Sequence, residues 1–215
     1  SEGENSSNYK NKFSSENFGS IFYDISYPLK KEGKFFDNFF TAKGSLMYSP
    51  NSNKDMKTLD RKIDINNIFT QNRLGLDDAV EGGQSLTVGF DYDLKTKENN
   101  DFLGFSLGQI FRDTEYDRLP IKSKMQNKSS DIVGNFNFEP NNIFKVNYDF
   151  SLDNNLGSMN YTKIETQLSV NNFVTSFDFL EENDDIGSDS YLLTDVKYKF
   201  DNKNSITYNT RRNRK

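Results

Sequence analysis

The sequence predicts an all-β protein, and more specifically an antiparallel transmembrane β-barrel of which this chain forms a segment of about 10 strands. Three observations support this prediction. Apolar and polar residues alternate along several stretches, and this period of two is typical of a strand with a different environment on each face. The chain is 14% aromatic although only 33% of it is hydrophobic. No run of about 18 apolar residues occurs, which excludes a transmembrane helix.

The clearest alternation lies in residues 84–94. Its apolar positions are Leu86, Val88, Phe90, Tyr92 and Leu94. The same pattern recurs in residues 144–152, with Val146, Tyr148 and Phe150, and in residues 194–200. The intervening positions are polar and include Asp91, Asp93, Lys145 and Asp149. We expect the apolar side chains to face lipid and the polar ones to face a lumen.

Composition excludes several other classes. A mean hydropathy of -0.83 alone would indicate a very polar or partly disordered chain, but disordered chains contain few aromatic residues. The absence of cysteine excludes disulfides and thiolate chemistry, and the absence of histidine removes the usual general base. With 27 basic and 32 acidic residues, the bulk charge gives no support for a nucleic-acid partner. We predict no enzyme activity, no cofactor and no metal site.

The chain divides near residue 83 within one domain. In residues 1–83 we expect irregular N-terminal barrel strands separated by long loops. Residues 20–27 alternate and are predicted to end at Pro28, an aromatic cluster occupies residues 35–40, and residues 46–50 form a short strand.

Residues 84–215 are predicted to hold regular antiparallel strands of about 10 to 12 residues, long enough to cross a bilayer when tilted. The predicted strands lie near 84–95, 101–113, 129–139, 142–153, 160–171, 172–182, 189–201 and 203–212. Tight turns alternate with longer charged connections, as in outer-membrane barrels. The chain begins without an initiator Met or a secretory signal and ends amid charges, so we expect it to be truncated at both ends.

Three motifs follow one another between residues 45 and 112. The first is Tyr48-Ser49-Pro50-Asn51, and the third is Ser106-Leu107-Gly108-Gln109 with Arg112. The second motif follows the pattern N-L-F-x-x-N-R-F-S-G-x-D-R-x-E-x-G. It matches this pattern at Asn67, Phe69, Asn72, Arg73, Asp78, Glu81 and Gly83. In order and spacing these motifs resemble the signature of LptD, the lipopolysaccharide-assembly family of the Gram-negative outer membrane. Residues 74–77 and Ala79 depart from the family pattern.

The resemblance implies a large barrel in the cell outer membrane. In that family a plug lipoprotein (LptE-like) sits inside the barrel, and a periplasmic bridge protein (LptA-like) delivers lipopolysaccharide. The barrel passes lipopolysaccharide to the outer leaflet through a lateral opening between its first and last strands. The implied partners are therefore lipopolysaccharide, the outer-membrane lipid bilayer, these two proteins and the barrel-assembly machinery.

The signature residues Asn72, Arg73, Asp78 and Glu81 lie in a polar stretch between predicted strands. One interpretation is a buried ionic and hydrogen-bonded network that fixes a loop inside the lumen, a role that suits the rigid donors of arginine. Another is a set of solvated loop charges worth little each. A catalytic carboxylate pair is a third, but acidic residues are more often turn formers.

Two further functions stay open at this point. A general outer-membrane porin or small diffusion channel would show the same strand pattern without the signature. A soluble β-sandwich carbohydrate-binding module would bury its aromatic residues between two sheets, although successive Lys and Asp residues on the second face argue against it.

Overall fold

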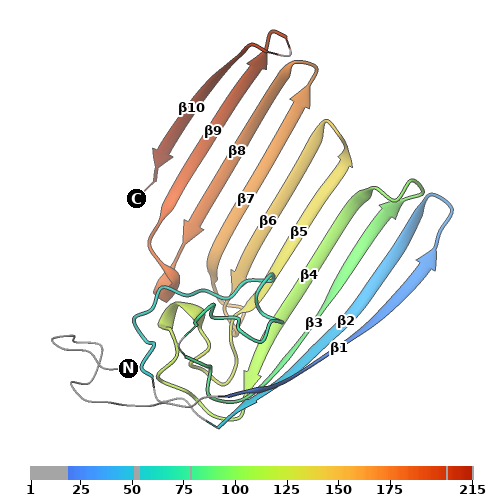
Figure 1. Cartoon of the computed structure of the whole chain (residues 1–215). Helices are drawn as coiled ribbons and strands as arrows, with labels where there is room; N and C mark the ends of the chain where they lie inside the picture. Colours follow the sequence, from blue (N-terminus) through green and yellow to red (C-terminus); the bar gives the residue numbers. More distant parts are fainter. Residues whose placement is uncertain (1–18, 51–53, 78, 202, 215) are drawn as a thin grey trace.

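The computed structural model describes residues 19–50, 54–77, 79–201 and 203–214, and it consists of one antiparallel sheet (Figure 1). The strands follow one another in chain order across the sheet. They are β1 (Ile21–Glu32), β2 (Phe36–Ser49), β3 (Gly83–Thr96), β4 (Asp101–Arg112), β5 (Ile132–Asn141), β6 (Phe144–Leu152), β7 (Met159–Val170), β8 (Phe173–Glu182), β9 (Ser190–Lys199) and β10 (Ser205–Asn213). Two short 3-10 helices, η1 (Ile121–Ser123) and η2 (Asp184–Ile186), lie in connections.

The all-β, antiparallel prediction is confirmed, and the number of strands matches the expected ten. The sheet is open, with β1 and β10 at its two edges, so closure into a barrel stays a prediction (Figure 1). A β-sandwich needs two sheets packed face to face. All named strands of the described residues belong to one sheet, which argues against that alternative. In the same residues no helix is long and apolar enough to cross a membrane.

The prediction of short strands before residue 83 is wrong for β1 and β2. β1 continues through Pro28 to Glu32 and has 12 residues, and β2 is a single strand of 14 residues that includes the aromatic cluster from Phe36 onward. Proline is tolerated in β1 because an edge strand has a partner on one side only. The eight later strands begin and end within three residues of their predicted bounds.

The two faces of the sheet differ as the alternation predicts. The register pairs Phe136 with Tyr148 on one face and Asn135 with Asp149 on the other. On the first face, rings from neighbouring strands contact each other: Phe90 lies 5.5 Å from Phe40 and 5.8 Å from Phe105 between centroids. We call this side the apolar face and the opposite side the polar face. Their assignment to lipid and lumen stays a prediction.

The two ends of the sheet also differ. The connections after β1, β3, β5, β7 and β9 are short turns, and we call their side the turn end. The connections after β2, β4, β6 and β8 are longer and gather at the opposite loop end (Figure 1). A second row of rings lies toward the turn end, where Phe102 contacts Phe36 at 4.7 Å and Phe138 at 5.4 Å.

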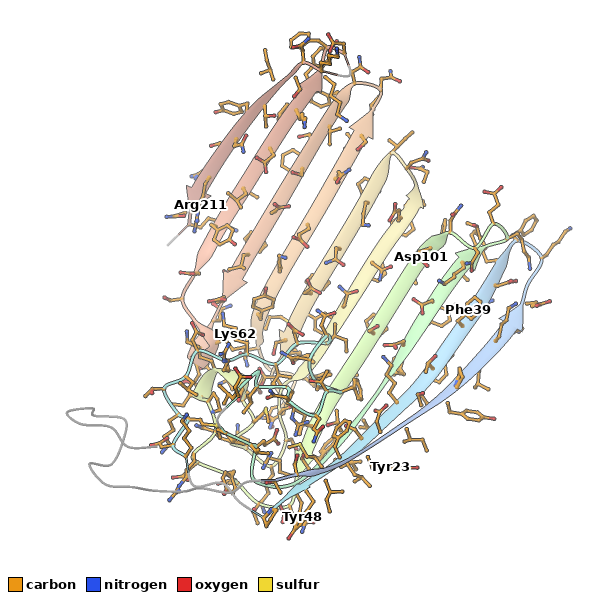
Figure 2. All side chains as sticks on the ribbon, in the orientation of Figure 1. Tyr23, Phe39, Tyr48, Lys62, Asp101 and Arg211 are labelled. Atoms are coloured by element: carbon orange, nitrogen blue, oxygen red, sulfur yellow. The ribbon has the colours of Figure 1, made fainter. Side chains whose placement is uncertain are left out.

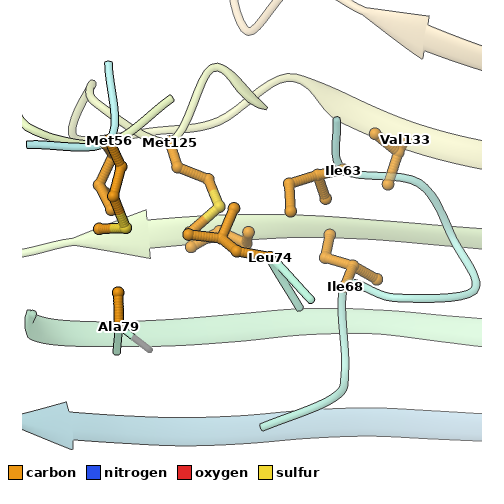
Figure 3. Packing of buried hydrophobic residues seen from close by; sticks show 9 residues of the cluster. Met56, Ile63, Ile68, Leu74, Ala79, Met125 and Val133 are labelled. Carbon is orange, nitrogen blue, oxygen red and sulfur yellow. The ribbon is translucent and has the colours of Figure 1, made fainter. Parts of the chain in front are cut away.

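The main hydrophobic core lies between the sheet and its loops. Residues 54–77, 79–82 and 113–131, which we call the loop layer, fold over the polar face at the loop end (Figures 1 and 2). Ile110 of β4 and Val133 of β5 pack there against buried residues of the layer (Figure 3). These layer residues are Met56, Ile63, Ile68, Leu74, Ala79, Leu119 and Met125.

Candidate functional site

Three signature residues meet in one buried ion cluster, which we call the anchor. Arg73 and Glu81 lie in the loop layer, and Arg112 is the last residue of β4. The Nε of Arg73 donates to Glu81 Oε2 over 2.6 Å, and Arg112 forms an ion pair with the same carboxylate. The three side chains are only 1–3% exposed. The structure therefore brings them together as a network, not as solvated loop charges.

Neighbouring strands complete the donor and acceptor set of the anchor. Arg73 donates to the Ser85 hydroxyl over 2.7 Å and to the Thr87 hydroxyl over 2.9 Å, both on the polar face of β3. Arg112 donates to the carbonyl of Gly82, and its guanidinium lies 5.6 Å from the Tyr116 ring. The three anchor residues, two arginines and one glutamate, carry a net positive charge. Within the described structure, the Nε of Arg112 is buried and has no hydrogen-bond acceptor.

Gly83 and Phe69 shape the space around the anchor. Gly83 has φ +86°, a backbone conformation that favours glycine, and a Cβ there would lie 3.2 Å from Arg112 Nη2. The Phe69 ring lies over the polar face at Gly89 and Gly108. The Lys43 ammonium is 5.5 Å from the centre of the same ring. These signature residues therefore serve packing next to the anchor.

The remaining signature residues do not join the anchor. Asn72 closes its own turn, because its side chain bonds both the N–H and the carbonyl of Leu76. Asn67 similarly bonds the N–H of Asp64 and the carbonyl of Lys62. Gln109 lies on the same strand as Arg112, but its side chain donates to the carbonyl of Ser130 and does not contact the anchor residues in the described hydrogen bonds. Asp78 lies outside the described residues.

A second buried polar cluster was not predicted from the sequence. Asp131, the residue before β5, accepts hydrogen bonds through Oδ2 from Ser151 of β6 over 2.9 Å and from Asn160 of β7 over 2.8 Å. Burial raises the pKa of the Asp131 carboxyl, although the two hydrogen bonds oppose that shift. A lone aspartate before a strand carries no sequence signal for such a role.

The loop layer also contacts the end of β8 and the 3-10 helix η2 through a set of ion pairs, which we call the latch. Lys62 forms an ion pair with Glu182 at the end of β8, and Lys124 forms ion pairs with Asp184 and Asp185 of η2. Burial acts to lower the pKa of Lys124, but its bonds to the two aspartates outweigh burial and raise it. The Lys124 ammonium in turn lowers the pKa of Asp184.

A polar cavity of about 270 Å³ lies between the loop layer and the sheet near the latch. The layer contributes residues 62–66, and the sheet contributes Asp149, Tyr161, Lys163 and Glu182 among others. Its volume is slightly below the range of about 300–1,000 Å³ that is typical of small-molecule sites. Acidic and basic side chains line it together with apolar residues, among them Ile63, Ile65 and Phe150.

The arrangement defines a class of protein. It is an all-β protein built on one open antiparallel sheet that has an apolar and a polar face, with loops held over the polar face by buried ion pairs. The family model of LptD, described as LPS transport system D, matches residues 2–210. The chain therefore belongs to the LptD family, an outer-membrane family of lipopolysaccharide transport and assembly that is not a family of enzymes. No curated protein sequence matches the chain.

Proposed function

We propose that this chain forms part of the wall of an outer-membrane translocon that delivers lipopolysaccharide into the outer leaflet. The observation that carries the proposal is the LptD family match over residues 2–210 of a chain whose whole described sheet has one apolar and one polar face. In this proposal the apolar face contacts the hydrocarbon of the bilayer and the polar face lines the lumen.

The exposure of large apolar side chains supports the first half of the proposal. Ile21, Leu46, Leu86, Phe177 and Ile206, from five different strands, are all well exposed. Water would disfavour such an extended apolar surface, whereas a bilayer would stabilise it. The aromatic row toward the turn end also fits, because aromatic girdles lie at the membrane interfaces of barrels.

The polar face supports the second half. Across β5 and β6, Asn135 donates to Asn147 over 2.9 Å and to Asp149 over 2.7 Å, and Asn147 lies 3.3 Å from Glu165 of β7. Such a band of amides and carboxylates would be costly against lipid and is stable against water. In this proposal the anchor holds the loop layer inside the lumen. There the layer narrows the open cross-section and contacts the plug lipoprotein. The periplasmic bridge protein and the barrel-assembly machinery are the further partners of this proposal.

Depletion of the full-length protein in its host tests the proposal. Newly made lipopolysaccharide, followed by pulse labelling and surface extraction, should stop reaching the cell surface as the protein disappears. The control is depletion followed by expression of the wild-type protein, which should restore delivery. If delivery continued at its normal rate while the uptake of small solutes fell, the porin alternative would replace this proposal.

A further inference from the structure

We propose that the loop layer is a hinged lid, fixed to the sheet at the anchor and releasable at the latch, which covers the polar cavity over β5–β8. The layer then has two states, and electrostatic screening shifts their populations. This inference does not depend on which molecule the barrel transports.

The fixed end is desolvated on all sides. The ion pairs of Arg73, Glu81 and Arg112 are 1–3% exposed, so dissolved salt screens them little. The apolar core lies close to the same end, where Ile68 and Leu74 pack with Ile110 of β4. The neighbouring residue of Ile68, Phe69, lies over Gly89 and Gly108. Moving the layer here would break buried ion pairs and open the core together.

The releasable end is held by ion pairs that reach solvent. In each pair one partner is more exposed than the other: Asp184 and Asp185 are 59% and 52% exposed against 11% for Lys124, and Lys62 is 34% exposed against 10% for Glu182. Pairs of this kind contribute little and are weakened by salt. Lys62 and Glu182 are 120 residues apart in the chain, and Lys124 and Asp184 are 60 residues apart. The latch therefore forms only when the tertiary structure brings these segments together.

The layer is built to move as one piece. Met56 N–H donates to the carbonyl of Arg118 over 2.8 Å, and Ile121 N–H donates to that of Lys57, so the two chain segments of the layer are bonded to each other. Asp60 and Lys122 add an ion pair between the same two segments. These contacts are internal to the layer and would survive its movement away from β8.

The cavity lies on the releasable side. Lys62 is both a latch residue and part of the cavity lining, and its partner Glu182 lines the opposite wall. Figure 2 shows Lys62 in the loop layer beside the lower ends of the strands on the β10 side of the sheet. Breaking the latch therefore removes a contact between the two walls of the cavity and increases the exposure of Asp149, Tyr161 and Lys163, which are partly buried beneath the layer.

Cysteine labelling of the full-length protein tests the lid, because these 215 residues contain no native cysteine. One reporter is Tyr161→Cys, inside the cavity, and the second is Ser45→Cys, a buried position on the polar face of β2 that makes no bond of the anchor. The rate of maleimide labelling at each site is read by peptide mass spectrometry in low and in high salt. High salt, or Lys124→Gln at low salt, should accelerate labelling of the first reporter by about three- to tenfold and leave the second unchanged.

The matched control is Lys122→Gln, which removes the same charge two residues away but breaks a pair internal to the layer. It should leave both reporters unchanged. A charge swap, Lys124→Glu with Asp184→Lys and Asp185→Lys, should restore slow labelling at the first reporter. Equal acceleration at both reporters would mean that the layer unfolds, and an effect of Lys122→Gln equal to that of Lys124→Gln would mean that bulk charge is responsible. Either result, or no response to salt, overturns the lid.

Discussion

Gly89 of β3 and Gly108 of β4 lie directly opposite each other, and together they form the floor on which the loop layer rests. A Cβ on Gly89 would lie 2.8 Å from Phe69 Cζ and would also meet the carbonyl oxygen of Leu107. A Cβ on Gly108 would lie 3.2 Å from Ile68 Cδ1. The close approach of the layer to the sheet therefore depends on the absence of side chains at both positions.

From this contact we predict that Gly89→Ala lowers the free energy of unfolding by about 1–3 kcal/mol through overpacking. Urea unfolding of the full-length protein, reconstituted in lipid vesicles, measures the effect. The control is Gly157→Ala, since a Cβ there meets nothing within 4 Å. Equal stability of both variants would show that the layer does not rest on this floor.

The anchor predicts an order of severity among its members. Glu81→Leu removes the carboxylate that both buried arginines contact in the described residues, and it should cost about 3–5 kcal/mol in the same unfolding measurement. Arg73→Met should cost less, because Arg112 still compensates the charge of Glu81. Glu115→Leu, an exposed position of the loop layer, should change little. The reverse order for Glu81 and Arg73 would contradict the buried-charge account.

The apolar face predicts a face-dependent response to charge. Phe90→Arg should destabilise the protein in a bilayer by about 2–4 kcal/mol if the residue lies near the midplane. Asp24→Arg, at an exposed position on the polar face of β1, should be close to neutral. Asp149, also on the polar face, does not serve as this control because its carboxylate accepts hydrogen bonds from Asn135 and Asn147. Similar losses at Phe90 and Asp24 would contradict the lipid assignment.

Asp131 predicts a pH dependence. Its pKa is raised in the folded state, mainly by burial, so the folded protein binds the proton more tightly than the unfolded chain does. The contribution of this group to stability therefore falls as the pH rises from the ordinary aspartate pKa through the raised value. Asp131→Asn should remove this dependence, so the variant gains relative to the wild type as pH rises through that window. Parallel stability profiles for the two proteins would contradict it.

The strands were predictable because their side chains alternate between two environments, and this signal is local. From Gly83 onward the alternation is nearly unbroken, so the predicted bounds are close. In β1 the signal is interrupted by Pro28, an edge-strand residue that resembles a strand end when only the sequence is considered. Tertiary context decided that case, because the N–H that proline lacks matters less at an open edge.

The loop layer and most of its contacts could not be predicted. Its buried apolar residues, among them Met56, Ile68 and Leu119, are scattered without helical or strand period. Glu81 and Arg112 are 31 residues apart, and only the family signature connected them. The latch lacks even that signal, because Lys62 and Lys124 are ordinary lysines in a lysine-rich chain. Long-range ion pairs between irregular segments leave no periodic trace in a sequence.

The strict chain-order topology of the sheet has a consequence for the order of assembly. Each strand pairs only with its neighbours in sequence, so the sheet can grow by adding one hairpin at a time. The anchor becomes possible as soon as β4 is in place, whereas the ion pair of Lys62 with Glu182 must wait for β8. If the strands are added from the N-terminal side, the loops are held early by the anchor and the latch forms late. An intermediate that stalls before β8 would leave Asp149, Tyr161 and Lys163 without the closing contact of Glu182.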